Sequence, residues 1–104
     1  IELYEKVAVG QKKTFLREVA LMSMAAALEE NGDLNSAKDV YSDFYDEYGL
    51  NSFYSSRALF NAARLTEASN KDLAISMYEQ LVGEFGDYGS EYAKMAKSRI
   101  AQLN

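Results

Sequence analysis

The sequence contains no histidine and no cysteine among its 104 residues. This absence removes the commonest general base, the commonest metal ligand and the thiol nucleophile. No disulfide can form. Ser90 and Lys94 would share a helix face, but neither oxyanion donors nor a glycine-rich phosphate loop accompanies them. We therefore expect no enzyme activity, and no catalytic, cofactor-binding or metal-binding residues.

Positive charge and long apolar runs are also scarce. The chain has 11 Lys and Arg residues against 16 Asp and Glu residues, a net charge of −5. Without a basic stripe to release counterions from phosphate, a nucleic-acid partner is not expected. The longest apolar stretch, around Ala25 to Leu28, is far shorter than the roughly 20 residues of a membrane helix. We therefore expect no membrane insertion by this segment.

Proline is missing too, and what remains has the period of helices. Apolar residues recur at steps of three and four, first in Leu21, Met24, Ala25 and Leu28, then in Leu34, Ala37, Tyr41, Phe44 and Tyr48. Asn31-Gly32-Asp33 separates the two runs. Two helices joined by so tight a turn must lie antiparallel and bury their apolar stripes against each other. Residues 21–48 are therefore predicted to form a helical hairpin.

The same pattern returns along the chain. Tyr4, Tyr41 and Tyr78 are spaced by 37 residues, with equivalent apolar neighbours. One extra residue in the last loop shifts the register to 38, which aligns Ala58 with Ala96. A period in the thirties built from two helices is typical of a helical solenoid. We predict an all-α fold of about six helices.

The predicted boundaries follow from this register, within a single domain of residues 1–104. Residues 1–9 would be the second helix of an incomplete repeat, residues 14–48 and 52–86 two full repeats, and residues 90–103 a terminal helix. Because the chain begins with Ile1, we read it as an excerpt of a longer protein. The predicted helix ends and caps are Thr14, Gly32, Asp33, Gly49, Asn51 or Ser52, Ser69 or Asn70, Gly86, and Gly89-Ser90.

These repeats resemble the tetratricopeptide repeat family, whose helix-turn-helix solenoids make protein–protein contacts. The resemblance rests on a pattern of a small residue, a leucine, a Gly-Asp turn, a second small residue and an aromatic residue. In the first copy these are Ala25, Leu28, Gly32-Asp33, Ala37 and Tyr41. The pattern returns as Ala62, Leu65, Ala74 and Tyr78. The resemblance implies a right-handed superhelix and a protein or peptide partner.

The chain departs from that family at a few positions. Gly49 and Gly86 replace the proline that usually follows the second helix, and Ser69 replaces a turn glycine. Phe44 and Leu81 occupy a position that is usually small. This last departure, together with the aromatic-glycine endings Tyr48-Gly49 and Phe85-Gly86, resembles the longer-period repeats of bacterial cell-envelope proteins. The resemblance implies a periplasmic or envelope location, with the cytoplasm as the alternative.

The resemblance also implies where a partner would bind. In such solenoids the first helix of each hairpin lines a concave groove. The corresponding positions are Met22, Ala26, Glu29, Ser56, Leu59, Ala63, Thr66, Lys94, Lys97 and Ala101. An amphipathic helix or extended apolar segment would suit this groove. The alternatives are self-association into a homodimer or a spacer role, and a groove for an apolar ligand or lipid.

One helix carries an acidic face. Asp39, Asp43 and Glu47 recur every four residues, with Asp46 beside them. This face could dock a basic partner or hold a divalent cation weakly, although the calcium-loop pattern is absent. The other interpretation is a solvated outer surface.

Overall fold

Five helices follow one another in the computed structural model, which describes residues 15–88 and 90–104. They are α2 (Phe15–Glu30), α3 (Leu34–Tyr48), α4 (Ser55–Thr66), α5 (Lys71–Phe85) and α6 (Glu91–Leu103), with 3-10 turns η1 (Gly49–Asn51) and η2 (Gly86–Tyr88). The described residues contain no strand, so the all-α prediction is confirmed. The predicted helix over residues 1–9 and the Thr14 cap lie outside the described residues.

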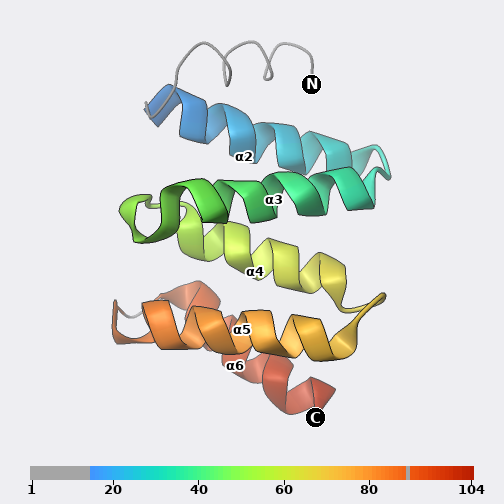
Figure 1. The fold of residues 1–104 in the computed structure, drawn as a ribbon, viewed down its shortest axis with the longest axis vertical. Coiled ribbons are helices and arrows are strands. Elements are labelled where there is room, and N and C mark those ends of the chain that lie inside the picture. The colour runs from blue at the N-terminus through green and yellow to red at the C-terminus, as the bar shows by residue number, and fades with distance from the viewer. Residues whose placement is uncertain (1–14, 89) are drawn as a thin grey trace.

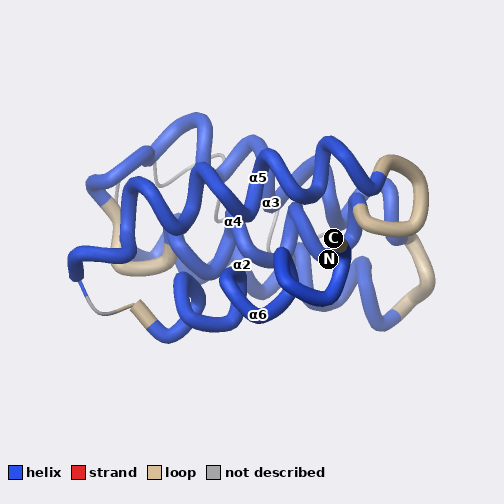
Figure 2. Tube along the Cα trace, turned by 90° about the horizontal axis from the view of Figure 1, so that it is seen from below, coloured by secondary structure: helices blue, strands red, loops and turns tan. Residues whose placement is uncertain are grey.

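The helices stack in chain order, and consecutive helices run in opposite directions (Figure 1). Each packs against the next, and α4 also contacts α6. Figure 2 looks along the stack and shows α3 and α5 toward one side, α2 and α6 toward the other. Short connections explain this arrangement: they run from three residues (31–33) to six (49–54), and connections this short favour antiparallel neighbours.

Local signals account for most helix ends. Gly32 adopts the left-handed conformation (φ 83°) after α2, which costs a glycine little. The side chains of Asn70 and Ser90 cap α5 and α6, accepting from the backbone N–H of Leu73 (3.0 Å) and Ala93 (3.4 Å). Asp33 occupies the cap position of α3, but its side chain makes no capping hydrogen bond.

The start of α4 differs from its prediction. The Ser52 hydroxyl accepts from the backbone N–H of Tyr54 at 3.1 Å, a local turn that competes with helix. Phe53 and Tyr54 therefore lie in this turn, and α4 begins at Ser55 rather than residue 53. The helix also ends at Thr66, two residues earlier than the predicted residue 68.

Gly49 and Gly86 end their helices differently, although the repeat makes them equivalent. Gly49 has positive φ (52°) and stops α3. Gly86 keeps helical angles (φ −60°), and the chain continues into η2. The prediction that α5 ends near Gly86 is confirmed, but a left-handed glycine is not what ends it.

The core forms two clusters that repeat each other. Leu59, Ala74, Tyr78, Leu81 and Phe85 belong to one cluster, together with Phe60, Ala63, Ala93 and Ala96. The other contains Met22, Ala25, Ala37, Tyr41, Phe44, Tyr48, Ala58 and Ala62. Five pairs of residues occupy equivalent places in the two clusters, 37 positions apart: Met22 and Leu59, Ala37 and Ala74, Tyr41 and Tyr78, Phe44 and Leu81, and Tyr48 and Phe85. The period seen in the sequence is therefore a period of core packing.

Candidate functional site

Four of the predicted groove residues are buried. Leu59 and Ala63 pack in the cluster between α4, α5 and α6, with 4% and 0% of their surface exposed. The Thr66 hydroxyl donates to the backbone carbonyl of Ala62 at 2.8 Å, and Met22 packs against α3 and α4. The side chains of Leu59, Ala63 and Thr66 are not available to a partner, which corrects the expectation that they line an open groove. Met22 is also buried, but it borders a small cavity of about 180 Å³.

The accessible face of α4 lies on the other side of the helix. Arg57, Asn61 and Arg64 of α4 line an open cavity of about 370 Å³ together with Ala26 and Glu29 of α2; Glu30 and Tyr41 complete it. Ala26 and Glu29 of the predicted groove thus lie beside a cavity. The α4 residues opposite them are not the ones that the sequence predicted for the groove. Of the four remaining predicted residues, Lys94, Lys97 and Ala101 are exposed on α6, and Ser56 on α4 lines a second pocket, described below.

A cluster of Glu29, Arg64 and Tyr41 joins α2, α4 and α3. Nη2 of Arg64 lies 2.9 Å from Oε1 and 2.8 Å from Oε2 of Glu29. Hydrogen bonding to Glu29 raises the pKa of Arg64. Burial raises the pKa of the Tyr41 phenol, and the negative charge of Glu29 raises it further. The three side chains tie successive helices together along one rim of the cavity.

Glu67, Arg99 and Tyr78 form a similar cluster further along the chain, in which Tyr78 is the repeat equivalent of Tyr41. Nε of Arg99 on α6 donates to Oε2 of Glu67 at 3.0 Å, and Nη2 forms an ion pair with the other oxygen. The Tyr78 hydroxyl of α5 also donates to Glu67. The hydrogen bond from Arg99 lowers the pKa of Glu67, and the one from Tyr78 lowers it further, against the opposing effect of burial.

Replacing Glu67 with glutamine should destabilise the fold more at pH 6 than at pH 3. Because folding lowers the pKa of Glu67, its charged form stabilises the protein fully above the ordinary value of 4.5. That stabilisation is lost as the pH falls through the lower folded value. The wild-type urea midpoint should exceed that of Glu67→Gln at pH 6, and the two should converge toward pH 3. Exposed Glu79 provides the control, since Glu79→Gln should show no such convergence; a constant Glu67→Gln difference would contradict the assignment.

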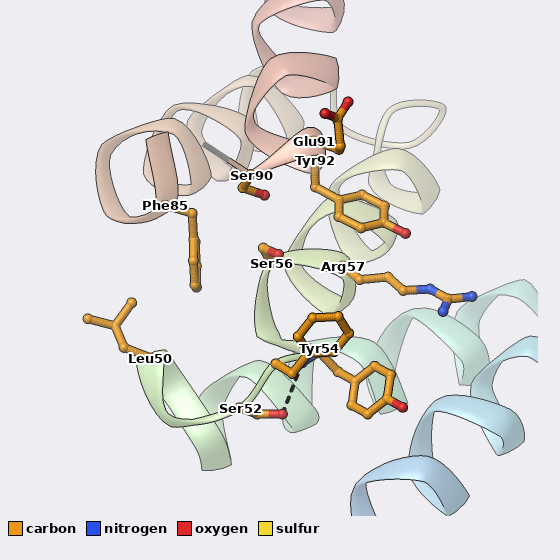
Figure 3. A pocket seen from close by; sticks show the side chains of 10 residues that line it. Leu50, Ser52, Tyr54, Ser56, Arg57, Phe85, Ser90, Glu91 and Tyr92 are labelled. Atoms are coloured by element: carbon orange, nitrogen blue, oxygen red, sulfur yellow. Dashed lines mark hydrogen bonds between the residues drawn. The ribbon is translucent and has the colours of Figure 1, made fainter. Parts of the chain in front are cut away.

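An apolar pocket of about 590 Å³ lies where the start of α4 meets the start of α6 and the end of α5 (Figure 3). Its lining residues are Leu50, Ser52, Phe53, Tyr54, Ser56, Arg57, Phe85, Ser90, Glu91 and Tyr92. Five of these ten residues are aromatic or aliphatic, and most of the surface that lines the pocket is apolar. Phe53 and Leu50 are 89% and 59% exposed, and apolar side chains gathered at the surface mark interaction sites.

Few of these residues were predicted to form a site. Of the ten, Ser56 alone belonged to the expected groove. The sequence did contain one signal for this pocket: Leu50 and Phe53-Tyr54 are large apolar residues in the connector between two hairpins. An exposed connector does not need apolar side chains, so their presence there indicates a surface that binds something. The prediction assigned Phe53 to the helix, so its exposure was not anticipated.

The acidic face of α3 is exposed, which a docking surface and a solvated outer surface both require. Asp39, Asp43, Asp46 and Glu47 are all exposed, and Glu47 pairs with Arg17 of α2. In the part of the chain that the structure describes, no group of three or more acidic residues could hold a metal ion. The cation-site alternative therefore finds no support.

Ser90 and Lys94 have other partners. The Ser90 hydroxyl caps α6, and the Lys94 ammonium lies 3.5 Å from Glu91 Oε1. Neither contact resembles a serine activated by a lysine base.

Within residues 15–88 and 90–104, none of the helices has the length and apolar character needed to cross a membrane. No protein-family model matches this chain, and no curated protein or solved structure matches it either.

Proposed function

We propose that this chain is a non-catalytic protein-interaction module that binds a peptide segment of its partner in the apolar pocket. The observation that carries the proposal is the exposure of Phe53 and Leu50 beside a cavity of about 590 Å³. Binding sites for small segments and ligands have volumes of this order, with apolar walls and a few polar groups that set orientation.

We further propose that the helices form a short tetratricopeptide-like right-handed superhelix. Two observations support this: the core clusters are equivalent at a period of 37 residues, and so are Tyr41 and Tyr78 within the two Glu–Arg–Tyr clusters. Repeats that contact only their neighbours build stable, extended surfaces suited to partner binding.

The proposed setting is a scaffold role within a bacterial cell-envelope assembly. It rests on the resemblance of the aromatic-glycine helix ends, Tyr48-Gly49 and Phe85-Gly86, to envelope-type repeats. A cytoplasmic module is the alternative. Fractionation of the native host's cells, with an antibody raised against this chain, would distinguish the two locations.

Phe53→Ala should abolish most peptide binding without unfolding the protein. Peptides selected from a displayed random library against the purified chain should bind Phe53→Ala at least about tenfold more weakly, as loss of an aromatic anchor does. Because Phe53 is 89% exposed, the substitution should change the protein's free energy of unfolding by less than about 0.5 kcal/mol. Fluorescence anisotropy gives the affinities, and thermal melting followed by circular dichroism gives the stability.

Leu73→Ala is the matched control, since Leu73 is a half-exposed apolar residue at the start of α5 and does not line the pocket. It should leave peptide affinity unchanged. Equal weakening by both variants, or a library that yields no binder sensitive to Phe53, would overturn the proposal.

The apolar walls also favour a second candidate, a site for a lipid or another apolar small ligand. In that case phospholipid should raise the melting temperature of wild type but not of Phe53→Ala. Absence of any shift would dispose of this candidate.

A further inference from the structure

Arg57 lies between the apolar pocket and two further cavities on the α2 side. It lines all three, the smallest of them with Met22 and Ala26 of α2. Its side chain is exposed and, within the described residues, makes no hydrogen bond or ion pair. By contrast, Arg64, about two helical turns further along α4, forms an ion pair with Glu29. Because no carboxylate of the described residues pairs with Arg57, this cation beside an apolar pocket is placed to meet a carboxylate of a partner.

Glu91 stands at another part of the same rim, with Tyr92 between it and Arg57 (Figure 3). Its only ion pair among the described residues is with Lys94, at 3.5 Å, and the two side chains are 78% and 68% exposed. So exposed a pair, three residues apart on one helix, is weak. Glu91 can therefore exchange Lys94 for a cation of a bound partner at little cost.

We infer that the pocket takes a peptide in which an apolar side chain is flanked by an acidic residue on one side and a basic residue on the other. The apolar side chain enters between Phe53, Tyr54 and Phe85. The acidic residue pairs with Arg57, and the basic residue pairs with Glu91. This inference rests on the proposed function and adds the order of charges in the partner, because rim charges set orientation and specificity more than affinity.

The protein's net charge of −5 does not oppose an acidic group at this site. In physiological salt, exposed charges more than about 8 Å apart are largely screened. Arg57 acts at contact distance, and so does Glu91 on the other flank. The bound segment as a whole carries both signs.

The test compares peptide selection by wild type with selection by the double variant Arg57→Glu, Glu91→Lys. Wild-type binders should carry acid and base in one order around the apolar residue, and the double variant should select the reverse order. Exchanging the two charges in a wild-type peptide should weaken its binding to wild type about tenfold and tighten its binding to the double variant. The preference should shrink when salt rises from 50 to 500 mM.

Lys71→Glu, Glu79→Lys is the matched control, an exchange of the same charges at exposed positions on α5 outside the pocket. It should keep the wild-type order. Both double variants should melt near wild type, because all four side chains are exposed.

Binders that depend on Phe53 but show no charge order would overturn this inference and leave the proposed function standing. No Phe53-dependent binder at all would overturn both. Sedimentation showing a dimer that Phe53→Ala dissociates would make a second copy of the chain the occupant, and would also overturn the peptide assignment.

Discussion

Leu59→Glu is expected to leave the chain unfolded at 25 °C. Leu59 is 4% exposed within the cluster that joins α4, α5 and α6. The substitution removes a core side chain, which costs about 2–5 kcal/mol, and places a carboxylate among the apolar side chains of this cluster, where burying a charge is costly. The sum approaches or exceeds the roughly 5–15 kcal/mol that stabilises a domain of this size. Far-ultraviolet circular dichroism and urea titration would show loss of the cooperative transition.

Leu73→Glu is the control for that experiment. Leu73 is 49% exposed in the first turn of α5, where a carboxylate also faces the positive end of the helix dipole. Its stability should stay within about 0.5 kcal/mol of wild type. If Leu59→Glu instead melted like wild type, Leu59 would be accessible, and the groove expected from the sequence would be restored.

Tyr41→Ala is expected to cost about 3–5 kcal/mol, as truncation of a large core side chain does. Tyr41 is 4% exposed and packs with Ala37, Phe44 and Ala62. Tyr78→Ala should cost a similar amount, because Tyr78 occupies the equivalent place and is 0% exposed. Chemical denaturation of both variants measures the losses.

Tyr41→Phe separates packing from the phenol. It keeps the ring and removes the hydroxyl near Glu29, so it should cost only about 0.5–1.5 kcal/mol. A loss below 1 kcal/mol for Tyr41→Ala would show that Tyr41 is not a core residue. Widely different losses for Tyr41→Ala and Tyr78→Ala would argue against equivalent repeats.

The hairpins could be predicted from the sequence because their signals are local. The three-and-four spacing from Leu21 to Tyr48, with Gly32 between the helices, needs no information from elsewhere in the chain. Asn70 and Ser90 mark the starts of α5 and α6 for the same reason. The period of 37 residues then places Tyr41 and Tyr78 in equivalent cores before any coordinates are known.

The rotation of α4 could not be predicted in this way. Its buried residues, Ser55, Ala58, Leu59, Phe60, Ala62, Ala63 and Thr66, cover most of the helix circumference, because α4 packs against α3, α5 and α6 at once. The polar residues Arg57, Asn61 and Arg64 leave a narrow open face at steps of four and three, the spacing of one side of a helix. The resemblance to tetratricopeptide repeats placed the groove on the opposite, apolar side, so Leu59 and Ala63 were expected in the groove that Arg57 and Asn61 line.

By itself the sequence determined that the chain is helical, where most helices begin and end, and which residues recur in its core, since each depends on neighbours a few residues apart or on a fixed period. Only the tertiary structure decided which side of α4 is open, that Arg99 meets Glu67, and that Leu50, Phe53 and Tyr92 surround one pocket. Those contacts join residues some 30 to 40 positions apart, and their geometry is set by how whole helices pack.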